Sequence, residues 1–215
     1  MDLSQRINPA TTAVITVECQ RGVIGKGAMF PALVEAVDES GMIANGQAVL
    51  AAARKAGAPV LHGLALRRED RGGQKANCRL LAMAMKAPGE GLRPGSEQAR
   101  LIPEFGPEDS DFLVPRLHGV TIFHGTEMDS LLRNLGVETI VLLGVSLNIA
   151  ILGSAIEAVN CGYQVVVPHD GTAATPPSYG QSVLKHSLPM VATITDCQSL
   201  SACFAQPTSG SAGEN

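Results

Sequence analysis

Short runs of apolar and β-branched residues recur along the chain, separated by longer segments with a different pattern. Near-continuous apolar runs of this length are typical of strands that are buried on both faces of a parallel sheet. We therefore predict five strands and a shorter sixth one at Thr12–Val17, Pro59–Leu66, Phe112–Val114, Glu138–Leu143, Tyr163–Val167 and Met190–Thr195.

Apolar residues at helical spacing occupy the intervals between these runs. The segments that begin at Met128 and Leu152 carry apolar residues at positions i, i+3, i+4 and i+7, which is the pattern of an amphipathic helix. Weaker patterns of the same kind cover Ser40–Ala56 and Tyr179–Leu188. Helices thus alternate with strands.

A glycine ends a predicted helix directly before a predicted strand at Gly57, Gly136 and Gly162. Glycine adopts the left-handed conformation at a helix end without a side-chain penalty. The repeated order of helix, glycine and strand indicates right-handed crossovers between parallel strands. We expect an α/β fold, a three-layer α/β/α sandwich around a mostly parallel sheet of about six strands.

The length of 215 residues and a hydrophobic content of 45% suit one globular domain, which we place at residues 1–205. Residues 67–107 are rich in Gly, Pro and charged residues, with one short helix candidate at Cys78–Met85. We interpret them as an excursion over the strand ends or at an oligomer contact. Residues 206–215 have low complexity and are predicted to be a disordered tail.

Charge and composition exclude several classes of function. A net charge of −4 and an aromatic content of 3% leave neither a basic face nor stacking platforms for nucleic acid. No apolar run approaches the ~20 residues of a membrane span, and the N-terminus lacks a signal peptide's apolar segment. Five widely spaced cysteines without a CxxC motif argue against disulfides and zinc knuckles. We expect a soluble cytoplasmic protein without a metal or cofactor.

Polar residues that directly follow the strands are candidates for chemistry, because ligands bind at the carboxyl ends of parallel strands. Glu18 follows the first strand, where burial of a carboxylate costs several kcal/mol unless it is paired. We interpret it as an acid/base group, with a merely hydrogen-bonded strand-end residue as the alternative. Cys19 is expected to face away from Glu18 as a buried structural thiol. We expect no cysteine at a helix N-terminus, where a thiolate would be activated.

Two further strand ends offer polar groups. Arg116 and His118 follow the short third strand and are a candidate cation and imidazole, with surface loop residues as the alternative. His124 is a weaker candidate. We interpret His62, inside the second strand, as a core histidine, and the charged run Arg67–Asp70 as a solvated loop.

The segment Gly144–Ala150 joins a strand to an apolar helix through a tight turn. The unpaired N–H groups and positive dipole end of such a helix start suit an anion or an oxyanion. The side chains offered are Ser146, Asn148 and Ala150. Ser146 lacks the G-x-S-x-G pattern of a serine hydrolase.

Taken together, these segments resemble the isochorismatase-like hydrolase superfamily, which includes isochorismatases, nicotinamidases and N-carbamoylsarcosine amidases. The resemblance runs from about Thr12 to Leu200. The family's first strand ends in D-x-Q, and here Glu18-Cys19-Gln20 stands in that place. The family motif G-V-x-T-x-x-C corresponds to Gly144–Ala150, and the family loop that ends in S-A-F-x-G-T corresponds to Pro115–Thr126.

All three members of the family's Cys–Asp–Lys triad are changed in this sequence. Ala150 stands in place of the cysteine, Glu18 in place of the aspartate, and Arg116 or a neighbour in place of the lysine. Thioester chemistry is excluded at this position, because alanine offers no nucleophile. The resemblance also implies a Rossmann-like topology, a cis bond at Val145–Ser146, and a homodimer or homotetramer.

We carry two hypotheses for function. The first is a hydrolase that acts on a small polar or anionic molecule by non-covalent acid/base chemistry. Glu18 would be the general acid/base, Arg116 and His118 would bind or polarise the substrate, and backbone N–H groups near Ser146 and Ala150 would stabilise negative charge. In this hypothesis the remaining substrate-binding residues are Gln20, Asn148 and His124.

The second hypothesis is a catalytically inactive member that binds a ligand or a partner subunit. A pocket filled by Leu117, Leu147 and Ile149 would favour it. A zinc enzyme is disfavoured, because the D-x-H metal motif of nicotinamidases has no counterpart in Arg67–Asp70.

Overall fold

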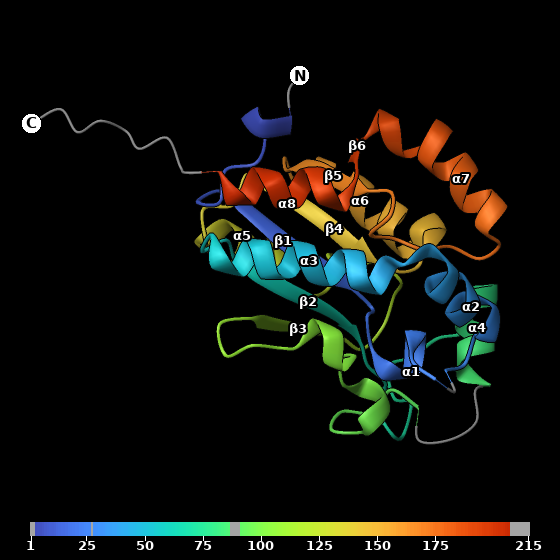
Figure 1. The fold of residues 1–215 in the computed structure, drawn as a ribbon. Coiled ribbons are helices and arrows are strands. Elements are labelled where there is room, and N and C mark those ends of the chain that lie inside the picture. The colour runs from blue at the N-terminus through green and yellow to red at the C-terminus, as the bar shows by residue number, and fades with distance from the viewer. Residues whose placement is uncertain (1–2, 27, 87–90, 207–215) are drawn as a thin grey trace, which may run out of the picture.

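The structure is a computed structural model that describes residues 3–26, 28–86 and 91–206. Six parallel strands form one sheet in the order β3-β2-β1-β4-β5-β6 (Figure 1). The predicted three-layer α/β fold with a six-stranded parallel sheet is therefore confirmed. The strands are β1 (Thr12–Val17), β2 (Val60–Ala65), β3 (Phe112–Arg116), β4 (Thr139–Gly144), β5 (Gln164–Pro168) and β6 (Thr193–Thr195).

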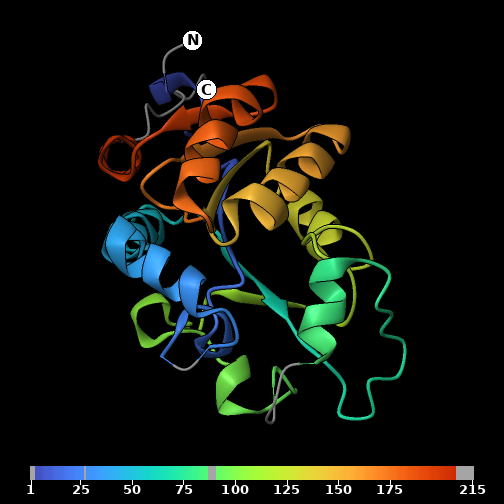
Figure 2. The same cartoon turned by 90° about the vertical axis from the view of Figure 1, so that its right-hand side faces the viewer.

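Helices cover both faces of the sheet. Helices α3 and α8 lie side by side on one face, and α5, α6 and α7 supply the core of the other (Figures 1 and 2). The helices are α1 (Arg21–Ile24), α2 (Pro31–Ser40), α3 (Met42–Lys55), α4 (Arg79–Met85), α5 (Met128–Asn134), α6 (Leu152–Asn160), α7 (Pro177–His186) and α8 (Cys197–Ala205). No described helix is both long enough and apolar enough to cross a membrane.

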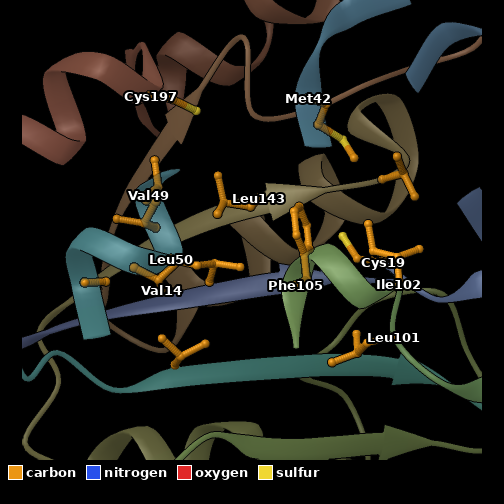
Figure 3. Close-up of a cluster of buried hydrophobic side chains, with 14 of the residues drawn as sticks. Val14, Cys19, Met42, Val49, Leu50, Leu101, Ile102, Phe105, Leu143 and Cys197 are labelled. Carbon is orange, nitrogen blue, oxygen red and sulfur yellow. The ribbon is translucent and has the colours of Figure 1, made fainter. Parts of the chain in front are cut away.

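The two-sided burial explains why the strands read as continuous apolar runs. In β1, Val14 belongs to the core under α3 and α8, whereas Ile15 belongs to the core on the opposite face. Strand β4 alternates in the same way, with Leu143 on the first side and Leu142 on the second. Figure 3 shows the first of these cores, in which Val14 and Leu143 lie among side chains of α3. Every position of both strands is buried, so neither face alternates with solvent-exposed polar residues; the threonines at positions 12, 16 and 139 are buried as well.

Three helices and several strand boundaries differ from the prediction. Helices α1, α2 and α8 were not predicted, β3 extends to Arg116, and β6 is shorter than the predicted run Met190–Thr195. Pro189 lies in the first turn of a 3₁₀ helix at Leu188–Met190, which ends before the strand begins. Proline suits such a helix start because its φ is already helical and its missing N–H is not needed.

A buried polar chain links β1, β2 and α3, and it confirms His62 as a core histidine. The His62 side chain is fully buried, with Thr16 Oγ1 2.7 Å from Nδ1 and Asp111 Oδ2 3.1 Å from Nε2. Arg54 of α3 donates to the same Asp111 carboxylate at 2.6 Å. Burial is the main cause that lowers the pKa of His62, although hydrogen bonding to Asp111 opposes it. Neutral His62 can accept from Thr16 and donate to Asp111, so every partner in the chain is satisfied.

The predicted domain boundary at residue 205 and the predicted disordered tail are not tested. Helix α8 ends at Ala205, and the structure describes the chain up to Gln206. The rest of the predicted tail, residues 207–215, lies outside the described residues.

Candidate active site

A cavity of about 880 Å³ lies at the carboxyl ends of the strands. Residues at the ends of β1, β2, β3 and β4 line one side of it, among them Glu18, Arg116 and Ala150. Residues of α4 and parts of α1 and α2 also line it. Residues between Arg67 and Met85, together with Leu92, therefore lie at the strand ends, one of the two places that the sequence predicts for this excursion.

Glu18 lies directly after β1 in an unusual backbone conformation. Its φ of 55° is in the left-handed region, which costs a non-glycine residue about 1–2 kcal/mol. The Glu18 N–H still donates to Gly63 O at 2.9 Å, so the turn stays attached to β2. Strained non-glycine residues of this kind cluster at functional sites, because the surrounding structure holds them there.

Arg116, the last residue of β3, forms an ion pair with the Glu18 carboxylate. Strand β2 lies between β1 and β3, so the long arginine side chain spans the end of β2 to reach Glu18. Arg116 also donates from Nη1 to Gly119 O at 2.6 Å. The Glu18 side chain is only 17% exposed and the Arg116 side chain 10%. The pair is therefore largely shielded from water, and its attraction is stronger than that of a surface pair.

The segment after β4 forms the remaining wall beside Glu18. The Val145–Ser146 peptide bond is cis, as the family resemblance predicts. A π-helical turn at Leu147–Ile151 follows and leads into α6. Ala150 is buried in this turn, and Ser146, Asn148 and Ala150 all line the cavity.

The backbone N–H groups of this segment are partly occupied. Leu147 N donates to Ala173 O at 2.8 Å, and Ile149 and Ile151 both donate to Ser146 O. The Ser146 N–H has no acceptor among the residues that the structure describes. Asn148 Oδ1 is likewise buried without a partner in the described part of the chain. This segment thus has a backbone donor at Ser146 and a side-chain acceptor at Asn148 without partners among the described residues.

Close approach of β1 and β4 at their ends requires a glycine at position 144. Gly144 has a φ of 107°, and a Cβ there would lie 2.4 Å from Val17 O and 2.7 Å from Cys19 Sγ. Only a residue without a side chain fits in this space. The turn that carries Ser146 can therefore lie directly beside the turn that carries Glu18.

Two predicted substrate-binding residues do not line the cavity. Gln20 is fully buried, and its amide donates to Ala65 O and Ala99 O and accepts from Ala65 N at 2.8 Å. This side chain joins β2 to the segment before β3, so its polar groups are already used. His124 is exposed outside the cavity, with its ring 6.4 Å from that of His118. His118 itself lines the cavity and is exposed.

The cysteines lie outside the cavity lining. Cys19 is buried in the core shown in Figure 3, and burial, together with the charge of Glu18, strongly raises the pKa of its thiol. Strand β1 ends at Val17, so the left-handed turn at Glu18, not strand alternation, separates the two side chains. The expectation that no cysteine lies at a helix N-terminus is wrong for Cys197, the first residue of α8, and for Cys78, the N-cap of α4. Burial and the neighbouring Asp170 carboxylate nevertheless raise the pKa of Cys197.

The interpretation of Arg67–Asp70 as a solvated loop is wrong for its first residue. Arg67 lines the cavity and is only partly exposed, because α4 folds back against it. Arg68 and Asp70 pair with each other at 2.7 Å on the surface, as a solvated loop would. The sequence shows that Arg67 lies shortly after a strand, which is a signal for a site residue. It does not show that α4 contacts Arg67. Among the described residues, no three His, Cys, Asp or Glu side chains cluster as metal ligands.

Comparison with known proteins agrees with the fold and the motifs. The profile of the isochorismatase domain matches residues 12–199. The uncharacterised isochorismatase family protein YecD of Escherichia coli O157:H7 is 27% identical over 90% of this chain and 96% of its own length. The ureidoacrylate amidohydrolase RutB of Rhizobium rhizogenes is 28% identical over 94% and 87%.

Among solved structures, a cysteine hydrolase from Pseudomonas syringae pv. phaseolicola 1448A superimposes with a TM-score of 0.80 at 22% identity, covering 93% of this chain and 94% of that one. At this identity the likeness shows the fold alone. The domain match extends over most of the sequence, from the first strand to the last helix. This chain therefore belongs to the isochorismatase family of hydrolases.

Proposed function

We propose that this protein hydrolyses a small polar or anionic molecule by acid/base chemistry, without a covalent intermediate. The ion pair between Glu18 and Arg116 at the cavity wall is the observation that carries the proposal. A carboxylate on a strained residue, held by a shielded guanidinium beside an open cavity, is a positioned proton acceptor.

The absence of a thiol from the cavity lining supports a non-covalent reaction. By its resemblance to the family motif, Ala150 stands in place of the cysteine, and no cysteine is among the cavity-lining residues that the structure describes. Water is then the nucleophile. Glu18 takes a proton from water as the water oxygen attacks the electrophilic carbon, and it returns that proton to the leaving group.

Three other groups have roles in this reaction. The Ser146 N–H stabilises the negative charge that develops on the attacked group, because it has no other acceptor in the described part of the chain. Arg116 keeps the Glu18 carboxylate in place through its second hydrogen bond to Gly119 O. Asn148 Oδ1 accepts a hydrogen bond from an N–H or O–H of the substrate.

Hydrolysis of a panel of amides, vinyl ethers, esters and lactones by the purified full-length protein tests the proposal. We expect Glu18→Gln to lower the rate about 10²–10⁴-fold, the usual scale for a general acid/base. Glu69→Gln is the matched control, because Glu69 is 82% exposed, pairs with Arg93 and does not line the cavity. Equal rates for the wild type and Glu18→Gln on a hydrolysed substrate would remove Glu18 from the mechanism.

A ligand-binding protein without catalysis is the second candidate, and Ala150 is the observation that favours it. The three apolar residues that would fill the pocket in that case do not do so. Leu147 is buried in the core, whereas Leu117 and Ile149 are 43% and 41% exposed at the wall of an open cavity. Tight binding of a panel compound with no turnover by the wild type would support the second candidate.

A further inference from the structure

The cavity carries more positive than negative charge. Among the described residues that line it, Arg67, Lys75, Arg79 and Arg116 are cationic, and Glu18 is the one carboxylate. Arg116 is already paired with Glu18. Among the residues that the structure describes, the other three cations form no ion pair. A cavity with this excess of one sign attracts molecules of the opposite sign.

Arg67 is the only partly buried one of these three cations, because Lys75 and Arg79 are exposed and screened by water. Its backbone N–H donates to Leu92 O at 2.8 Å, and Nη1 donates to Ala84 O at 2.5 Å, near the end of α4. Burial, followed by the charges of Arg71 and Arg116, lowers the pKa of Arg67, and Glu18 offsets this only in part. An anion bound to Arg67 would relieve this repulsion.

The wall next to Arg67 is apolar. Leu80, Leu81, Met83 and Met85 of α4 line the cavity, together with Phe30 and Leu33 at the start of α2. Met83 is 46% exposed, and the other side chains of α4 that line the cavity are mostly half-buried. Ligand sites combine an apolar lining of this kind with a few placed polar groups.

We propose that the cavity selects small amphipathic anions, with the anionic group on Arg67 and the apolar body against α4 and α2. Arg116 is unsuited to this role because the Glu18 carboxylate beside it repels an anion. The inference rests on the proposed function in one respect, because such an anion would be the substrate of the proposed hydrolysis. Binding itself does not require turnover.

The test compares phenylacetate with phenylacetamide, which share a shape and differ in charge, by titration calorimetry on the full-length protein. Acetate serves as a third probe that lacks the apolar body. We expect wild type to bind phenylacetate about tenfold or more tightly than phenylacetamide, the scale of one charge-assisted hydrogen bond. Acetate should bind more weakly than phenylacetate, because it leaves the apolar wall uncovered.

Two arginine variants separate ligand recognition from support of α4. Arg67 and Arg71 both donate to carbonyl groups at the end of α4, Arg67 to Ala84 O and Arg71 to Met85 O, but only Arg67 lines the cavity. Arg67→Met should abolish the preference for phenylacetate, and Arg71→Met should retain it. Arg67→Lys keeps the charge and should keep part of the preference, so a folding defect in Arg67→Met does not end the test.

Equal affinity of wild type for the two probes would overturn the proposal. An equal loss of preference in Arg67→Met and Arg71→Met would also overturn it, because the effect would then act through α4. Glu18→Gln should keep the preference. If the preference is present but no substrate of the panel is hydrolysed, the binding inference stands and the proposed hydrolysis fails, so the two failures are distinguishable.

Discussion

Glu18 shows how a single residue can serve a site at the expense of local stability. Its left-handed backbone turns the carboxylate toward Arg116 and the cavity, while the next residue, Cys19, lies in the core. A glycine at this position would avoid the strain but would offer no carboxylate. The strain at Glu18 is therefore consistent with selection for chemistry, not for stability.

The burial of the thiols leads to a prediction at the residue scale. Iodoacetamide should modify Cys78 in the folded protein, because this thiol is exposed. Cys19 and Cys197 should stay unmodified, since both are buried and have raised pKa values, which leaves little reactive thiolate. Peptide mapping by mass spectrometry measures the adducts, and hydrolysis should survive the treatment. An adduct on Cys19 that substrate prevents, together with loss of activity, would identify Cys19 as a nucleophile instead.

At the scale of elements, the site depends on how strands and helices are joined at their ends. Gly144 lets the end of β4 lie against the end of β1, and Gln20 joins the β1 end to β2 and to the segment before β3. The hydrogen-bonded side chains of Thr16, His62, Asp111 and Arg54 link β1, β2 and α3. These contacts set the relative positions of the strand ends from which the cavity is built.

Two glycines that both have a positive φ should respond differently to substitution by alanine. Gly144→Ala should destabilise the protein by about 2–3 kcal/mol and impair hydrolysis, because the new Cβ collides with Val17 O as well as adopting an unfavourable φ. Gly57→Ala should cost about 1 kcal/mol, since its φ is 75° but no atom lies within 4 Å of the added Cβ. Urea unfolding of both variants measures the difference. Equal losses would mean that the contact at Gly144 is relaxed easily.

Buried His62 should make the folded state sensitive to acid. Its pKa is lowered in the folded protein, mainly by burial, so the unfolded chain binds this proton more readily. The stability that neutral His62 contributes is present above the unfolded pKa of about 6.5 and is lost as the pH falls from there toward the folded pKa. Urea unfolding between pH 8 and pH 5 should show this decline. The His62→Gln variant should be less stable than the wild type at pH 8. It should also lose the part of the decline in unfolding free energy that begins near pH ~6.5. An unchanged decline in this variant would assign the decline to other groups.

At the scale of the whole molecule, the cavity combines parts that are distant along the chain. Strand ends from the first 150 residues supply Glu18, Arg116 and the segment after β4, and residues between Arg67 and Met85 line the cavity beside them. The outer surface also exposes apolar residues away from the cavity, such as Ile156 and Val159 on α6, which are 45% and 41% exposed. Exposed apolar residues of this kind are compatible with contacts between subunits.

The predicted homodimer or homotetramer is testable in solution. We expect sedimentation or light scattering to give a mass of two or four times the 22.3 kDa chain. Ile156→Lys should then shift the assembly toward smaller species if α6 takes part, because it would place a charge in the contact. Leu113→Lys on the edge strand β3, where Leu113 is 50% exposed, is the matched control. A wild-type mass of one chain at all concentrations would contradict the prediction.

The sequence by itself determined the class of fold and the position of two residues of the cavity wall. Apolar runs, helical spacing and the glycines at helix ends are local patterns, and each one constrains only its own neighbourhood. They were enough to predict a parallel sheet with helices on both faces, and to place Glu18 and Arg116 at strand ends. The family motifs added the turn at Gly144–Ala150.

Only the tertiary structure decided which of the candidate residues meet. The strand order β3-β2-β1-β4 brings Arg116 across β2 to Glu18, and the return of α4 places Arg67 at the cavity. The same packing directs Gln20 into backbone contacts and leaves His124 outside the cavity. These outcomes depend on contacts between segments that are far apart in the chain. Local hydrophobic patterns carry no information on such contacts, because the same pattern is compatible with several strand orders and loop paths.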